Sequence, residues 1–285
     1  MSVNYRHAFH VGNHADVLKH VCLTLVVEHL KHKAAPFAVM DTHAGRGSYA
    51  LDGQEAQRSP EWRGGVGRLW DWADAPAAMT PYLAALKTAN PDGALAQYPG
   101  SPALALGGLR AGDRLVACEL HPEEAGALKR RFEEDPRAQI HQRNGFEAMS
   151  ALLPFTERRG VVLIDPPYED RDLETIQCIR ALRAALDRFG HGIYMWWRPV
   201  KDVRETDIAD AELLHGPGLG RTLNALRVDL AVDRVTPEGR LVASSMLIVN
   251  PPYTLAPALA EILPALAARL ALSDGAGWRQ ESIGG

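Results

Sequence analysis

The fold of this chain is decided by the stretch Gly160-Val161-Val162-Leu163-Ile164-Asp165-Pro166-Pro167-Tyr168. A continuous apolar run of this length is typical of a parallel strand that is covered on both faces of a sheet. The two prolines stiffen the corner that follows and push Asp165 toward an extended backbone. The stretch therefore predicts a central strand whose carboxyl end presents a carboxylate and main-chain carbonyl groups.

Other apolar runs along the chain end in the same way. Phe37 to Met40 leads into Asp41, and Arg114 to Cys118 leads into Glu119. Further strands are expected at the following ranges: 138–142, 193–197, 225–235 and 241–249. Helices expected at 13–32 and 173–189 alternate with them. This order predicts an α/β doubly wound sheet of seven mostly parallel strands, with ligands bound beyond their carboxyl ends.

The last two strands are expected to form an antiparallel hairpin at the sheet edge, because Pro237-Glu238-Gly239 between them is typical of a turn. After a helix rich in leucine and alanine, residues 273–285 are expected to be a polar tail. The distance in sequence between Asp41 and Glu119 far exceeds one crossover, so residues 50–97 are predicted to form an inserted helical subdomain. Residues 1–285 are otherwise expected to be a single domain.

Composition limits the classes of function. The net charge of −4 and the sequence pI of about 6.3 argue against a globally basic nucleic-acid-coating surface. Three scattered cysteines indicate neither a disulfide framework nor a thiolate zinc site. Without a readable export signal or a hydrocarbon-spanning run, we expect a cytoplasmic protein with no membrane role. Residues 1–33 are weakly basic and form a candidate segment for contacting substrate and cofactor.

Asp165, Pro166 and Tyr168 are the candidate catalytic residues. The exocyclic amine of a nucleobase is a poor nucleophile, because its lone pair is delocalised into the ring. If Asp165 and the carbonyl of Pro166 each accept one N–H, the lone pair is directed toward an incoming methyl group, and Asp165 can take the released proton. Tyr168 would stack on the extruded base. The alternative is a structural turn after a strand.

Several loops at the predicted carboxyl ends are candidates for binding a nucleoside cofactor. Gly45 would allow close approach of the backbone, and His43 offers a hydrogen-bonding partner. Glu119 is placed to accept ribose hydroxyls. Ser101 is expected to cap a helix whose free N–H groups face a carboxylate. Each of these residues, and the pair Asn144-Gly145, is also explained by a purely structural role.

A histidine-rich segment and a second double-proline motif complete the list of notable patterns. His7, His10 and His14 lack an acidic or thiolate companion, so a metal site is not predicted, and a substrate-facing cluster with Tyr5 and Arg6 fits better. Asn250-Pro251-Pro252-Tyr253 repeats the double-proline pattern. Because it follows the last strand and not a central one, Asn250 is expected to have a structural role.

Taken together, the motifs closely resemble the bacterial 23S ribosomal RNA adenine-N6 methyltransferase J family over nearly the whole chain. The segments that carry the resemblance are Asn4-Tyr5-Arg6-His7-Ala8-Phe9-His10, Asn13-His14-Ala15-Asp16-Val17-Leu18-Lys19-His20, Asp41-Thr42-His43-Ala44-Gly45-Arg46-Gly47, Tyr98-Pro99-Gly100-Ser101-Pro102, Glu119-Leu120-His121-Pro122 and Asp165-Pro166-Pro167-Tyr168-Glu169. The resemblance implies a Rossmann-like class I methyltransferase fold with a small helical insertion.

The resemblance also implies S-adenosyl-L-methionine as the cofactor and 23S ribosomal RNA as the partner. We separately expect the protein to be a monomer. Asp165 would accept the proton and Tyr5 would contact the RNA, beside Arg6 and His7. The implied cofactor-binding residues are Lys19, His20, His43, Gly45, Ser101, Glu119, Asn144, Gly145 and Asp165. Three alternatives remain open: guanine-N2 methylation, a non-catalytic RNA-binding or assembly protein, and a nicotinamide enzyme.

Overall fold

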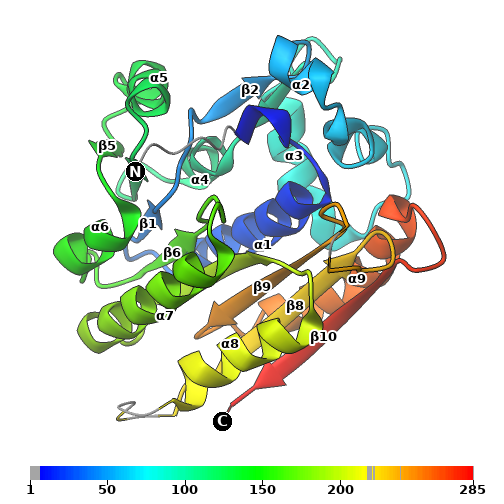
Figure 1. The fold of residues 1–285 in the computed structure, drawn as a ribbon. Helices are drawn as coiled ribbons and strands as arrows, with labels where there is room; N and C mark the ends of the chain where they lie inside the picture. The colour runs from blue at the N-terminus through cyan, green and yellow to red at the C-terminus, as the bar shows by residue number, and fades with distance from the viewer. Residues whose placement is uncertain (1–6, 217–219, 221, 238, 285) are drawn as a thin grey trace.

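A central sheet runs through the computed structural model, which describes residues 7–216, 220, 222–237 and 239–284 (Figure 1). Within these residues the sheet has eight strands in the order β10-β8-β9-β7-β6-β1-β4-β5. Their bounds are Ala38–Asp41 (β1), Arg114–Glu119 (β4), Ala138–Gln142 (β5), Gly160–Ile164 (β6), Ile193–Pro199 (β7), Ala225–Ala231 (β8), Ala243–Val249 (β9) and Gly277–Ile283 (β10).

The strand directions place the predicted acidic residues together. β1 pairs in parallel with both β4 and β6, and β6 pairs in parallel with β7. From β1 the chain moves outward through β4 and β5, and then returns to β6 on the other side of β1. The carboxyl ends of β1, β4 and β6 therefore meet at the point where the strand order reverses, which is where doubly wound sheets bind ligands.

Side chains of the central strands alternate between two cores. Val161 and Leu163 of β6 pack into the core on one face of the sheet, whereas Val162 and Ile164 pack into the core on the other. Successive side chains of a strand point to opposite faces, so an uninterrupted apolar run is what this position in the sheet requires. The strand predicted from this run is confirmed.

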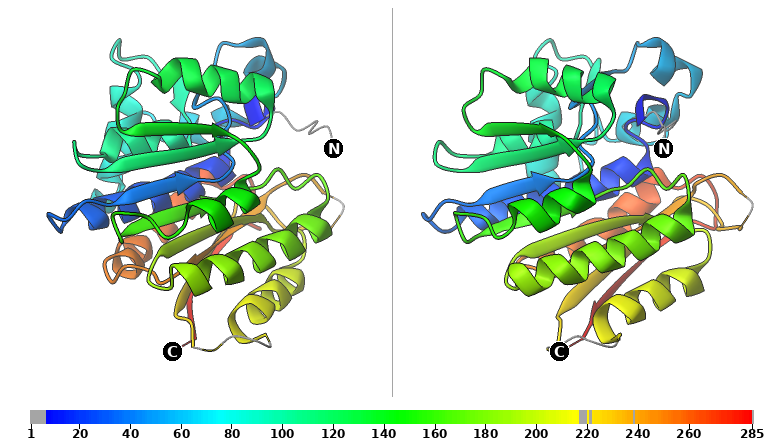
Figure 2. Two further views of the ribbon diagram at one scale, coloured as in Figure 1. Left: turned by 90° about the vertical axis from the view of Figure 1, so that its left-hand side faces the viewer. Right: turned by 60° about the vertical axis from the view of Figure 1, so that its left-hand side comes forward.

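Helices cover both faces (Figure 2). The first core is closed by α1 (His14–Lys31), α4 (Ser101–Gly108), α5 (Pro122–Phe132) and α9 (Leu255–Leu270). The second is closed by α6 (Gly145–Leu152), α7 (Arg171–Arg188) and α8 (Val203–His215). Asn13 caps α1, because its side chain accepts hydrogen bonds from the backbone of Ala15 and Asp16.

A small antiparallel ribbon frames the segment for which an insertion was predicted. Its strands are β2 (Ser48–Ala50) and β3 (Gln97–Pro99). Between them lie α2 (Gln54–Arg58), three single 3₁₀ turns (Glu61–Arg63, Val66–Arg68 and Ala77–Met79) and α3 (Thr80–Thr88). Leu69, Tyr82 and Leu86 of this segment are buried in the core that α1 also lines. Another 3₁₀ turn, η1 (His7–Phe9), precedes α1.

Two predictions about the end of the chain are wrong: residues 273–285 are not only a polar tail, and the β8–β9 hairpin does not form the edge of the sheet. Residues 277–283 form β10, which pairs antiparallel with β8, so the sheet has eight strands and the confirmed β8–β9 hairpin is not at its edge. The strand was missed because most of its side chains are charged or polar and only partly buried, so no alternating apolar pattern marks it. No helix among the described residues is long and apolar enough to cross a membrane.

Asn250 has the structural role that was expected. Its backbone adopts φ 54°, a left-handed conformation that asparagine tolerates better than most residues. Its side-chain amide donates hydrogen bonds to the carbonyls of Gly190 and Gly192 at 3.1 and 2.7 Å. The second double-proline motif therefore joins β9 to the loop that precedes β7.

We expect Asn250→Ala to lower the free energy of unfolding by about 2 kcal/mol, because two hydrogen bonds are lost and alanine is strained at this φ. Urea denaturation of the variant and the parent protein measures the difference. Equal midpoints and slopes for the two proteins would contradict the assigned role.

Candidate active site

A cavity of about 390 Å³ lies at the carboxyl ends of β1, β4 and β6. The nine residues proposed from sequence to bind the cofactor all line it: Lys19, His20, His43, Gly45, Ser101, Glu119, Asn144, Gly145 and Asp165. A cavity of this size, lined by apolar groups and a few convergent polar ones, suits a small ligand. Asp165 and Glu119 stand on its walls, so the strand-end carboxylates face a common space.

The loop after β1 is tied to the end of β4. Gly45 has φ 58°, and its N–H donates to the Glu119 carboxylate at 2.9 Å. The N–H of His121 donates to the other oxygen of the same carboxylate at 2.7 Å. A Cβ on Gly45 would overlap the hydroxyl of Tyr49. Burial raises the pKa of Glu119, while the two backbone donors oppose the rise.

Asn144 is the N-cap of α6, accepting hydrogen bonds from the N–H groups of Phe146 and Glu147 at 2.8 and 3.3 Å. A Cβ on Gly145 would overlap the carbonyl oxygen of Thr42, so the start of α6 packs directly on the loop after β1. Sequence reasoning missed Phe146 and Leu120, two apolar residues that line the cavity. The only sequence signal for these two residues is that Phe146 directly follows Gly145 and Leu120 directly follows Glu119.

Ser101 does not cap α4, contrary to expectation. Gly100 occupies the N-cap position and Ser101 is the first helical residue. The Ser101 hydroxyl instead forms a hydrogen bond with the side chain of Asp41. Burial raises the pKa of Asp41 to about 6, and the hydrogen bonds from Ser101 and from the N–H of His43 oppose this rise. The cap prediction failed because the extended residue before the helix is the glycine that packs against Gly47.

Lys19 joins α1 to the loop after β6. Its ammonium forms an ion pair with Asp165 and a second one, at 2.8 Å, with Asp16. Lys19 and Asp16 are almost fully buried, at 4% and 2% exposure. Burial lowers the pKa of Lys19, but the two carboxylates outweigh it and raise the pKa above its usual value. Lys19 therefore remains charged and holds the Asp165 carboxylate in place.

His20 and His43 occupy neighbouring parts of the wall. His20 Nδ1 shares a hydrogen bond of 2.8 Å with the hydroxyl of Tyr98, and its Nε2 has no partner among the described residues. His43 Nδ1 bonds to the hydroxyl of Thr42 at 2.8 Å, and its ring packs edge-on against Phe146. Burial lowers the pKa of His20 to about 3 and that of His43 to about 4, so both are neutral at pH 7.

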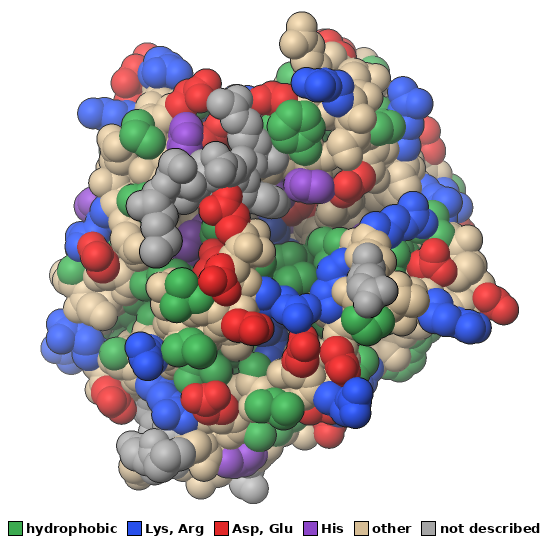
Figure 3. All heavy atoms as spheres, viewed as in Figure 1, with side chains coloured by type: hydrophobic (Ala, Val, Ile, Leu, Met, Phe, Trp, Pro, Cys, Tyr) green, Lys and Arg blue, Asp and Glu red, His purple; other side chains and the backbone are tan. Residues whose placement is uncertain are grey.

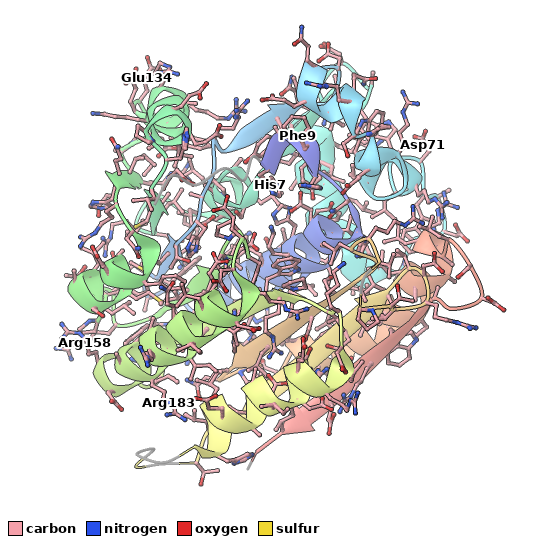
Figure 4. The ribbon with its side chains drawn as sticks, viewed as in Figure 1. His7, Phe9, Asp71, Glu134, Arg158 and Arg183 are labelled. Carbon is pink, nitrogen blue, oxygen red and sulfur yellow. The ribbon has the colours of Figure 1, made fainter. Side chains whose placement is uncertain are left out.

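His7 of η1 lines the cavity and lies beside the first turn of α1 (Figure 4). Its Nε2 donates to Asp16 at 2.9 Å, and Asp16 also accepts the N–H of Gly12 at 2.8 Å. Tyr5 and Arg6, the other two residues expected to contact RNA, lie outside the described residues. His10 donates to Glu61 at 3.0 Å. In the described part of the chain no group of three or more His, Cys, Asp or Glu residues is arranged to hold a metal ion.

A second cavity, of about 1060 Å³, adjoins the first. Both cavities are lined by His7, Lys19, Asp165, Pro166, Pro167, Glu169 and Asp170. The second one extends between η1, the loop after β6 and the β8–β9 loop. The side chain of Asp165 thus stands where two cavities meet, and only the second is lined by Tyr168.

Comparison with known proteins agrees with this geometry. The family model described as "Ribosomal RNA large subunit methyltransferase D, RlmJ" matches residues 34–283. Two curated relatives named ribosomal RNA large subunit methyltransferase J are each 39% identical to the chain. The one from Haemophilus influenzae aligns over 99% of both chains, and the one from Escherichia coli over 94% of both. A crystal structure of a Legionella pneumophila protein is 31% identical, covers 97% of this chain and 98% of its own, and superposes with a TM-score of 0.84.

The sheet order, the glycine loop and the strand-end carboxylates define a Rossmann-like methyltransferase of the class that uses S-adenosylmethionine. Within that class the chain belongs to the RlmJ family of ribosomal RNA large subunit methyltransferases. The fold, cofactor and family expected from the sequence are confirmed.

We expect Asp41→Asn to change how stability depends on pH. A carboxyl group whose pKa rises from 3.8 to about 6 on folding stabilises the protein below pH 3.8 and loses that contribution as the pH rises through 6. The variant lacks this loss, so its stability relative to the parent should be about 3 kcal/mol more favourable at pH 8 than at pH 3.8. Urea denaturation at several pH values measures this. A difference between the two proteins that is independent of pH would refute the assignment.

Proposed function

We propose that this protein transfers a methyl group from S-adenosylmethionine to the N6 amine of an adenine in 23S ribosomal RNA. The observation that carries the proposal is the position of Asp165 at the junction of the two cavities. The names of the two curated relatives support large-subunit ribosomal RNA as the substrate. We also propose that the protein acts as a monomer in the cytoplasm.

The first cavity suits the cofactor in its chemistry. Glu119 can accept ribose hydroxyls through the lone pairs that its two backbone donors leave unused. Leu120 and Phe146 offer apolar surface for an adenine ring. His20 Nε2 can bond to the amino-acid portion, since no described residue satisfies it. When bound, S-adenosylmethionine supplies a methyl group on a positively charged sulfur.

The loop after β6 would prepare the amine for attack. One amine N–H is donated to Asp165 and the other to the carbonyl of Pro166, so the lone pair points toward the first cavity. As the nitrogen gains the methyl group it loses a proton, and Asp165 accepts it. Lys19 keeps the carboxylate oriented during this step, because its ammonium is itself fixed by Asp16.

The second cavity would receive the base and the RNA next to it. On the loop after β6 and the start of α7 its lining includes Glu169, Asp170, Arg171 and Asp172, three acidic residues and one basic residue, whereas Lys201 and Arg240 line it from the β7–α8 and β8–β9 loops. Figure 3 shows both acidic (red) and basic (blue) side chains around the hollow in this face. Phosphates are attracted to the basic side and repelled by the acidic one. Such a division would direct the base toward Asp165, with Tyr168 beside it and His7, Tyr5 and Arg6 contacting the RNA.

Asp165→Asn should reduce the turnover number for 23S ribosomal RNA at least about 100-fold, because an amide cannot accept the proton. Binding of S-adenosylhomocysteine, measured by calorimetry, should persist. Asn250→Ala, which changes the asparagine of the other double-proline motif, is the control and should keep the parent turnover. An Asp165→Asn protein with the parent turnover number would remove Asp165 as the proton acceptor, whereas a parent protein that transfers no methyl group would favour the non-catalytic RNA-binding alternative.

Mass analysis of nucleosides from the reacted RNA identifies the methylated amine. N6-methyladenosine is the expected product. N2-methylguanosine would replace the adenine assignment with the guanine alternative and leave the role of Asp165 intact.

Glu119→Gln should weaken S-adenosylhomocysteine binding by about 10-fold to 100-fold, the range of a lost charged hydrogen bond. Glu134→Gln is the matched control, since Glu134 is exposed in the turn that follows α5 (Figure 4). The same titration against NAD tests the nicotinamide alternative. Unchanged affinity in the Glu119 variant would remove this residue from the cofactor site.

A further inference from the structure

We propose that Trp196, which lines neither cavity, is a positioning residue that fixes the catalytic loop through the hydroxyl of Tyr168. The inference rests on the proposed function and adds a residue to it. Trp196 lies on β7 and is 1% exposed. Its register partner on β6 is Ile164, the residue just before Asp165. Trp196 and the loop that begins at Asp165 therefore start from neighbouring positions on two paired strands.

Both hydrogen-bonding functions of the Tyr168 hydroxyl are used by β7. Trp196 Nε1 donates to the hydroxyl oxygen at 2.8 Å, and the hydroxyl donates to the carbonyl of Trp197 at 2.9 Å. The Tyr168 ring also packs edge-on against the Trp197 ring, with centroids 5.7 Å apart. The far end of the Tyr168 side chain is therefore fixed in position and direction.

The backbone of Tyr168 needs such an anchor. Its φ is 54°, a left-handed conformation that is unfavourable for a bulky side chain. Because two prolines precede it, the loop has few other torsions with which to adjust. Without the hydroxyl anchor, Tyr168 can relax toward negative φ. That change would move its ring and the adjoining Pro166-Pro167 backbone, which carries the carbonyl that receives the amine.

Trp196 is itself held rigidly. The guanidinium of Arg198 lies over its ring, 4.6 Å from the centroid. Arg198 in turn donates to the buried carboxylate of Asp210 on α8 at 2.6 Å. Cys178 of α7 supplies a buried thiol beside the same tyrosine and tryptophan. The support extends from α7 and α8 and shares no residue with the cofactor-binding wall.

The experiment compares Trp196→Phe, Tyr168→Phe and the double variant in methylation of 23S ribosomal RNA. Each single substitution removes the Trp196–Tyr168 bond and keeps an aromatic ring. We expect each to lower the turnover number about 10-fold or more, with unchanged affinity for S-adenosylhomocysteine. The double variant should lose no more than the more affected single variant, because both substitutions break one interaction. Trp278→Phe, on the half-exposed β10, is the control and should match the parent.

Losses that multiply in the double variant, or a Trp196→Phe protein with parent turnover, would overturn the inference. Equal falls in turnover and in cofactor affinity would show general unfolding and would also overturn it. If the parent protein methylates no RNA, the proposed function fails instead. The anchor is then judged by a crystal structure of Trp196→Phe, in which an unchanged φ at Tyr168 would refute it.

Discussion

The architecture depends on the buried ammonium of Lys19, which lies between Asp16 on its own helix and Asp165 on the loop after β6. An isolated charge at 4% exposure would be strongly unfavourable, so the ion pairs must form if α1 is to pack here. Removing either carboxylate leaves a buried charge with less compensation. The position of α1 against the sheet and the position of the Asp165 carboxylate are thus set by the same contacts.

The next residue of α1 extends this constraint to the inserted segment. His20 meets the hydroxyl of Tyr98 on β3, and that hydroxyl meets Tyr82 on α3 at 3.1 Å. Burial raises the pKa of both tyrosines, so they stay neutral and the network persists across the usual pH range. Lys19 faces the catalytic loop while His20 faces the insertion. One turn of helix therefore joins the loop after β6 to the inserted segment.

The parts of the fold that the sequence predicted are those whose signal is local. Three apolar runs, each followed by an acidic residue, predicted β1, β4 and β6. The carboxyl ends of these strands also gave the position of the cavity. The strand β10 was not predicted, because an edge strand with mostly polar side chains has no apolar run that ends in an acidic residue. The roles of Asp16 and Trp196 could not be read from the sequence, because they depend on contacts with Asp165 and Tyr168 from elements distant along the chain. The Ser101 cap failed for a different reason: glycine at the preceding position already has the extended backbone that an N-cap needs.

The same charges explain why one loop can serve two unlike ligands. Around the junction, one ammonium faces two carboxylates, so the cluster of Lys19, Asp16 and Asp165 has a net negative charge. A sulfonium in the first cavity is favoured by that charge, whereas a phosphate brought to the same point is opposed by it. In the proposed function the RNA backbone would then lie farther out, near Lys201 and Arg240, and an uncharged base would reach Asp165 more readily than a phosphate. This charge distribution would favour extrusion of the base over insertion of the strand.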